Sequence, residues 1–351
     1  MQERLGRIAA KLALVAGLPG RAHSFGEEAH RFRLGPPLPE SRVTEFETEH
    51  GIRLPEGYRS FLTTVGHAGA GPHYGLVPLE DWDLAVLDAV RPGHLREPFP
   101  LSPFDPAPGP DWYDALDDED AEPYPGALTL THRGCSHYTL LVVSGPARGR
   151  LVNADLDMRP PHFCHDTDFL GWYERWLDET AAGMGTAGFD LSLPYGEPEL
   201  ASVLRDAADA HQRRAAAWTL GRYPALAPAS RSLLRAAALG DAADEVRRAA
   251  VIALGRRPVP DDESALTRAL ADASAGTRAA ALRALARRGG AWHARGRALL
   301  SDTCPEVRRL AVRTLEESGV ITAEDLIPLL TDPDRSVRDA AAATLQGPAR
   351  K

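Results

Sequence analysis

The sequence is poor in cysteine and methionine, with three of each in 351 residues, and it contains only two lysines, Lys11 and Lys351. An odd number of scattered cysteines argues against a disulfide framework and favours reduced thiols. No stretch approaches the ~20 apolar residues that a membrane helix needs, and the apolar run at residues 8–18 is interrupted by Lys11. We therefore expect a cytoplasmic protein that begins with an amphipathic helix rather than with a signal peptide.

Motifs for catalysis or metal binding are also lacking. Two histidine–cysteine groups stand out, namely His132, Cys135 and His137, and then His162, Cys164 and His165. Neither group has the spacing of a structural zinc site, and strand alternation would separate His132 from Cys135 and His137. The glycine-rich segment 66–71 lacks a following Lys-Ser/Thr, so it is no phosphate loop. We expect no catalytic residue, no metal and no cofactor.

Charge is distributed unevenly along the chain. Residues 1–198 carry 16 basic and 30 acidic side chains, whereas residues 199–351 carry 24 and 19, within a net charge of -9. A chain of this length is longer than a domain with a single hydrophobic core usually is. We therefore expect two modules with different surfaces. The small basic excess of the second half, with acids interspersed, argues against nucleic-acid binding.

The second half of the chain consists of an internal repeat. Similar segments close on five leucines at intervals of 34, 31, 30 and 30 residues: Leu220, Leu254, Leu285, Leu315 and Leu345. Within 246–254 the apolar residues recur at i, i+3, i+4, i+7 and i+8, which predicts one buried helix stripe. Each unit should therefore pair this second helix with a first helix, near 200–208, 233–239, 266–271, 298–300 and 326–330.

An aspartate recurs six residues before an arginine between the two helices of four units. The pairs are Asp241/Arg247, Asp272/Arg278, Asp302/Arg308 and Asp332/Arg338. Such an aspartate can cap the next helix or accept hydrogen bonds from the arginine, which would form a ladder along the stack. This pattern, over about 199–346, resembles the short HEAT-like repeats first noted in phycobilisome-lyase-type proteins. The resemblance implies an all-α solenoid; such repeats occur in lyases, DNA-repair proteins and adaptors alike.

A solenoid of this kind exposes a long face built from its second helices. Arginines expected toward solvent on that face are Arg214, Arg248, Arg283, Arg309 and Arg313. They could bind an acidic partner, or they could form an ordinary solvated helix face. The sequence leaves both interpretations open.

The first half alternates helix and strand signals. Helices are expected at 39–50, 55–65 and 169–177, and strands at 74–79, 127–132, 138–144 and 150–154. The strands are separated by glycine-containing turns, as in an antiparallel meander. The aromatic residues of 169–177 share one helix face, and that spacing is more typical of a core than of a ligand site.

Several motifs of this half resemble the Smi1/Knr4 family of the SUKH superfamily. They are Glu45-Phe46, the run from Glu49 to Leu62 that contains Leu-Pro-Glu-Gly-Tyr, Val65-Gly66, Gly69-Ala-Gly-Pro-His-Tyr-Gly-Leu76, Gly134-Cys, Leu140-Leu-Val-Val-Ser-Gly145 and 169–177. The resemblance covers about 35–180. It implies an α+β fold and a non-catalytic, protein-binding role, in bacteria mainly immunity against polymorphic toxins, often nucleases. Two positions depart from the family pattern: His67 stands where the family usually has Asn, and Ser136-His137 stands in place of a small residue followed by an aromatic one. If these positions contact a partner, the chain would bind a different partner from other members of the family.

Residues 98–125 are rich in proline and contain eight acidic residues and no basic one. The densest run is Asp117, Asp118, Glu119 and Asp120. This segment is typical of a solvated surface loop. It could instead act as a decoy that occupies the basic cleft of a nuclease toxin, with opposite charge speeding encounter.

Together these features predict an α+β Smi1/Knr4-like domain at 1–180, a linker at 181–198 and a HEAT-like solenoid of about five repeats at 199–351. The leading functional hypothesis is toxin neutralisation through a groove around His67, Tyr74 and Trp82. One alternative is an intracellular scaffold whose solenoid recruits a protein partner. Another is a repeat-containing lyase or modification factor, which rests on fold analogy alone.

Overall fold

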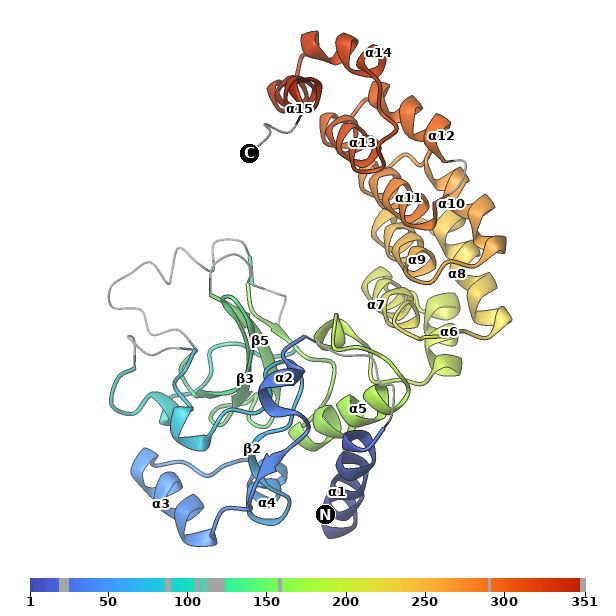
Figure 1. The fold of residues 1–351 in the computed structure, drawn as a ribbon. Helices are drawn as coiled ribbons and strands as arrows, with labels where there is room; N and C mark the ends of the chain where they lie inside the picture. Colours follow the sequence, from blue (N-terminus) through green and yellow to red (C-terminus); the bar gives the residue numbers. More distant parts are fainter. Residues whose placement is uncertain are drawn as a thin grey trace. The chain divides into compact units, whose positions relative to one another are not determined.

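A computed structural model describes residues 1–18, 25–85, 90–104, 108–109, 112, 124–156, 160–289 and 292–347. It divides the chain into two compact units, Met1–Pro194 and Tyr195–Lys351 (Figure 1). Within the described residues, no helix combines the length and the apolar character that crossing a membrane requires.

The first unit combines helices with two small antiparallel sheets. Its helices are α1 (Gln2–Ala16), α2 (Glu27–His30), α3 (Glu40–His50), α4 (Glu56–Thr64) and α5 (Phe169–Ala181). Its strands are β1 (Leu34–Gly35), β2 (His67–Gly69), β3 (Ala127–Gly134), β4 (His137–Val142), β5 (Leu151–Asp155) and β6 (His162–Phe163). Strands β3 to β6 form a meander in chain order, and β1 pairs with β2. Three of the four expected strands thus correspond to β3, β4 and β5.

The fourth expected strand, at 74–79, does not form. Only Leu76 makes isolated bridges, to Gly69 and to Thr131. The reason lies in the flanking backbone: His73 and Gly75 have φ of 55° and 89°, in the left-handed region that interrupts an extended chain. Pro78, which lacks an N–H donor, precedes a 3₁₀ turn at Leu79–Asp81.

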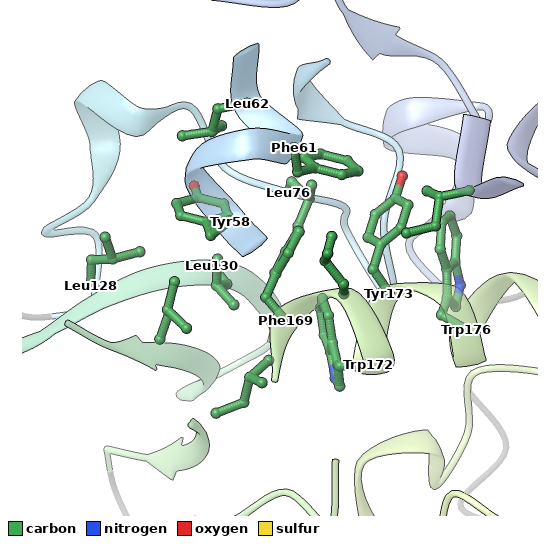
Figure 2. Packing of buried hydrophobic residues seen from close by; sticks show 14 of the residues in the cluster. Tyr58, Phe61, Leu62, Leu76, Leu128, Leu130, Phe169, Trp172, Tyr173 and Trp176 are labelled. Carbon is green, nitrogen blue, oxygen red and sulfur yellow. The ribbon is translucent and has the colours of Figure 1, made fainter. Parts of the chain in front are cut away.

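The core of the first unit lies between α4, α5 and the larger sheet (Figure 2). The Phe61 ring lies 5.0 Å from the ring of Phe169 and 4.8 Å from that of Tyr173, centre to centre. Trp172 and Trp176 are also buried. The aromatic face of α5 is therefore core, as its spacing predicts.

Helix α1 packs on α5 through charge as well as apolar contact. Leu5, Ile8 and Val15 are buried, as an amphipathic helix requires. Glu174 of α5, 8% exposed, accepts from Arg7 Nε at 2.6 Å and from Lys11 Nζ at 2.9 Å. These contacts fix the amino-terminal helix on the domain.

Residues 181–194, expected as the first part of a linker, belong to the first unit. Met184, Phe189 and Leu193 are buried, and Arg175 of α5 lies 3.9 Å above the Phe189 ring. The glycines that suggested a linker instead provide tight turns, since Gly183 and Gly188 both have positive φ. The connection between the units is therefore shorter than predicted.

The second unit contains five pairs of helices in its described part. The first helices are α6 (Glu197–Asp206), α8 (Pro228–Gly240), α10 (Glu263–Ala269), α12 (His293–Ala298) and α14 (Ala323–Leu326). The second helices are α7 (Ala210–Leu220), α9 (Asp244–Arg256), α11 (Ala275–Arg288), α13 (Pro305–Glu317) and α15 (Arg335–Gln346). Each set forms one row of the stack (Figure 1). The repeat period therefore predicted the solenoid correctly.

Small residues set the spacing within the row of second helices. A Cβ placed on Gly255 of α9 would lie 2.5 Å from Cβ of Ala284 in α11. A Cβ on Gly221 would lie 2.7 Å from Cα of Ala253. Both distances are shorter than real contacts allow, so glycine is needed for this close approach.

Candidate functional site

The aspartates and arginines between helices form a ladder, but its rungs join successive repeats. Arg247 donates through Nε and Nη2 to Oδ2 and Oδ1 of Asp272, at 2.8 and 3.0 Å. Toward its own turn it donates only to backbone carbonyls, Asp241 O at 2.9 Å and Ala242 O at 3.3 Å. The predicted pair of Asp241 and Arg247 thus forms through the backbone carbonyl of Asp241. The carboxylate of Asp241 instead accepts a hydrogen bond from Arg213.

The same rung occurs four times, as Arg213–Asp241, Arg247–Asp272, Arg278–Asp302 and Arg308–Asp332. Each aspartate also accepts from a backbone N–H two residues later, for example from Ser274 at 2.8 Å. The hydrogen bond from Arg308 lowers the pKa of Asp332. Ladder arginines are therefore neutralised inside the unit and are not available to a partner.

The arginines predicted to face solvent lie on the opposite side of the second helices from the buried stripe. Arg214, Arg248, Arg309 and Arg313 are all exposed. Positions 248, 252 and 256 follow at i, i+4 and i+8, so they share one helix face. We call the twelve equivalent positions of α7, α9, α11 and α13 the arginine stripe: Arg214, Trp218, Arg222, Arg248, Ile252, Arg256, Ala279, Arg283, Arg287, Arg309, Arg313 and Glu317.

Sequence reasoning missed three members of this stripe, Arg222, Arg256 and Arg287. Each follows the closing leucine of its repeat by two positions, and this register could have identified them. Arg256 is half-buried, with its guanidinium carbon 4.0 Å from the centre of the Trp218 ring. Burial, together with the charges of Arg222 and Arg287, lowers the pKa of Arg256 to about 10.

The stripe is strongly unbalanced in charge. Eight of its twelve positions are arginine and one is acidic, Glu317. Glu317 pairs with Arg313 at 3.6 Å, and both side chains are exposed, so this contact neutralises little. Asp241, Asp272, Asp302 and Asp332 are engaged in the ladder, so they do not balance the stripe. The stripe is therefore far more basic than the net charge of the second half suggests.

A groove of about 290 Å³ lies on the first unit. Its lining residues are Leu38, Arg42, Glu45, Phe46, Glu49, His50, Leu79, Glu80 and Trp82. The floor is apolar, with Trp82 only 8% exposed, whereas three carboxylates stand at the rim. His67 adjoins the groove, because its Nε2 accepts from the backbone N–H of Leu79 at 3.1 Å and lies 3.3 Å from Glu80.

Tyr74 is separate from this groove. Its ring stacks on His132 with centres 5.3 Å apart and meets the edge of Phe25 at 5.2 Å. The predicted group of His67, Tyr74 and Trp82 thus divides between the groove and an aromatic surface beside β3. The other predicted contacts, Asp117, Asp118, Glu119 and Asp120, lie outside the described residues.

Asp190 is the centre of a buried charge cluster in the first unit. Its Oδ2 lies 2.8 Å from His73 Nε2 and 2.9 Å from Arg133 Nη2. Burial opposes the charge of Asp190, but Arg133 and His73 outweigh it and hold the pKa of Asp190 well below its usual value. Because every partner comes from the same unit, we interpret this cluster as a brace for the Phe189–Leu191 turn.

The histidine–cysteine groups do not converge. Cys135 is exposed on a left-handed turn, whereas Cys164 is buried, which raises the pKa of its thiol. His132 Nε2 contacts the backbone oxygen of Cys135 at 2.9 Å. Across the described ranges, no three histidine, cysteine or acidic side chains are placed to hold a metal ion.

Comparison with known proteins found a family similarity for part of the second unit. A family model for HEAT repeats matches residues 197–286, whereas no Smi1/Knr4 model matches the chain. A search of curated proteins gave no match.

Two solved structures are similar over part of the chain. The crystal structure of YibA from E. coli is 21% identical over 46% of this chain and 63% of YibA, with a TM-score of 0.40. An engineered protein is 19% identical over 50% of this chain and 90% of its own, with a TM-score of 0.30.

Proposed function

We propose that this chain is a non-catalytic scaffold, acting inside the cell, that recruits a protein partner through the arginine stripe. HEAT repeats generally mediate protein interactions, and the match at 197–286 supports that class. The observation that carries the proposal is the imbalance of the stripe, where seven arginines are exposed or half-buried, Arg222 is buried, and one residue is acidic, Glu317. An ordinary solvated helix face mixes both signs of charge.

The second helices suit this role because the face opposite the arginine stripe is packed against the rest of the stack. Val246, Ala250 and Leu254 of α9 are buried in the stack, and the ladder fixes each repeat on the next. Arginine side chains on such a support lose less freedom on binding than they would on a loop. Charge complementarity would select an acidic partner and speed its encounter.

Affinity capture from the source cells tests this function. The stripe variant Arg248→Glu/Arg309→Glu should lose the partner that the wild type retains, because its two new negative charges would repel an acidic partner. The matched control is Arg268→Glu/Arg295→Glu, which changes two exposed arginines of the first helices α10 and α12. Equal capture by the stripe and control variants would refute the proposal.

Toxin neutralisation by the first unit is the second candidate. Its support is the acid-rimmed groove together with the Smi1/Knr4 resemblance of residues 35–180. An apolar floor beneath Glu45, Glu49 and Glu80 suits a basic, partly apolar contact of a nuclease toxin. Co-expression with a candidate toxin tests it: Trp82→Ala should abolish protection, whereas the stripe variant should leave protection intact.

A further inference from the structure

The last described repeat presents apolar side chains at the end of the stack. Helices α14 and α15 end the two rows of helices (Figure 1). Ile327 and Leu330, in the 3₁₀ turn Ile327–Thr331 that follows α14, are 58% and 40% exposed, and Leu345 of α15 is 37% exposed. Of the exposed large apolar side chains that the described part of the second unit carries, all but Tyr195 lie in this repeat. Solenoids usually end on a polar face instead.

The residues thirty positions earlier show which surface this is. Leu300 and Leu315, the equivalents of Leu330 and Leu345, are buried, at 7% and 0% exposed. Arg297, the equivalent of the third side chain, donates to Asp325 of the following repeat at 3.0 Å. The exposed face therefore corresponds to the surface through which one repeat packs on the next.

Arg338 extends the ladder to this face. Its Nη1 donates to the carbonyls of Asp332 and Pro333 at 2.7 and 3.0 Å, as Arg308 Nη1 does to the carbonyls of its own turn. Arg308 then binds Asp332 of the following repeat through Nε and Nη2. Within the described part of the chain, Nε and Nη2 of Arg338 have no such carboxylate. We call Ile327, Leu330, Arg338 and Leu345 the open end.

We propose that the open end binds a helical hairpin of the HEAT type in another protein, whose inter-helix turn presents a carboxylate to Arg338 and whose apolar side chains cover the three exposed ones. The chemistry is that of the existing rungs, in which a guanidinium forms two parallel hydrogen bonds with a carboxylate. The inference goes beyond the proposed function, because it concerns a different surface and does not depend on the arginine stripe.

A second copy of this chain fits the open end less well than a different protein does. Its ladder aspartates already accept from arginines of the preceding repeat. Its first repeat has Ala207 at the position that Asp241 occupies in the next one. A second copy therefore offers no ladder aspartate that could complete the rung, and we assign the carboxylate to a different protein.

Fluorescence anisotropy of a labelled peptide with the full-length protein tests the inference. The peptide copies residues 317–346, a hairpin of this chain with Asp332 at its turn. It should bind, and the same peptide with Asp332→Ala should bind at least about ten-fold more weakly, because a charge-assisted pair is lost. Arg338→Gln in the protein should have the same effect and should cause no further loss with the Asp332→Ala peptide. Absence of binding, or additive losses, would overturn the inference.

The matched control is Arg335→Gln, on the same helix as Arg338. Arg335 is exposed and lies 3.5 Å from Asp339, so its replacement should change binding less than about two-fold. The stripe variant Arg248→Glu/Arg309→Glu should bind the peptide as the wild type does, which separates this inference from the recruitment function. If the stripe variant loses the peptide while Arg338→Gln retains it, the open end is refuted and the stripe stands.

A lengthened chain tests whether the open end accepts a repeat without the cost of bringing two molecules together. In this variant a copy of residues 317–346 follows Gln346, which places another ladder aspartate after Arg338. The melting temperature should exceed that of the wild type, and Arg338→Gln should lower it more in the lengthened chain than in the original. No gain, or an equal effect of Arg338→Gln in both chains, would overturn the inference. A gain without binding of the free peptide would refute docking of another protein.

Discussion

Arg247 and Asp272 belong to different repeats, yet both carboxylate oxygens of Asp272 accept from the Arg247 guanidinium, at 2.8 and 3.0 Å. Because Asp272 also accepts from the N–H of Ser274, one side chain joins two repeats and holds the turn that precedes α11. The rung is mostly shielded from solvent, with 14% and 10% of the two side chains exposed.

We expect Asp272→Ala to lower the free energy of unfolding by about 1–3 kcal/mol, because Arg247 and the Ser274 N–H both lose an acceptor. Denaturant unfolding of Asp272→Ala, Arg247→Met and the double variant measures the coupling. Additive losses would show that the two side chains do not interact.

The close approach of α9 and α11 makes a second prediction. Gly255→Ala should destabilise the protein by about 1–3 kcal/mol, because its Cβ would overlap Ala284. Gly240→Ala, at the end of α8 with nothing within 4 Å, should be neutral or stabilising by up to about 1 kcal/mol. Thermal melts compare the two. Equal effects would mean that the helices are not in this contact.

Acid should release the amino-terminal helix. Hydrogen bonds from Arg7, Lys11 and Arg4 outweigh burial and hold the pKa of Glu174 at about 2, below the ordinary value of 4.5. A depressed pKa in the folded state contributes stability that is fully present above about pH 4.5 and is lost as the pH falls toward 2. In the Glu174→Gln variant, the free energy of unfolding should therefore fall less over this pH range than it does in the wild type.

The matched control for this acid prediction is Glu28→Gln, which changes an exposed carboxylate of α2. It should keep the wild-type pH profile of the free energy of unfolding. An unaltered profile in Glu174→Gln would contradict the role of the Glu174 contacts.

The repeat unit was predictable from sequence because Leu220, Leu254 and their equivalents recur at a nearly constant interval. The rung between Arg247 and Asp272 was not, since the constant spacing is between Asp241 and Arg247, and stacking alone decides which aspartate is in reach. Helix periodicity predicted the exposure of Arg248, and the same periodicity extended by about two turns would have included Arg256.

In the first unit, local patterns predicted elements but not the grouping of surface residues. The face of α5 is core, as its aromatic spacing indicates. His67, Tyr74 and Trp82 are close in sequence, but left-handed residues at His73 and Gly75 turn the chain, and Tyr74 packs on His132 away from the groove. No local periodicity encodes such turns.

The affinity of the captured partner for the full-length protein, measured by titration calorimetry, tests the central claim most directly. The account predicts that Arg248→Glu/Arg309→Glu weakens binding by about a hundred-fold or more, whereas Arg268→Glu/Arg295→Glu changes it less than about three-fold. A similar affinity of both variants for the partner would contradict recruitment through the arginine stripe.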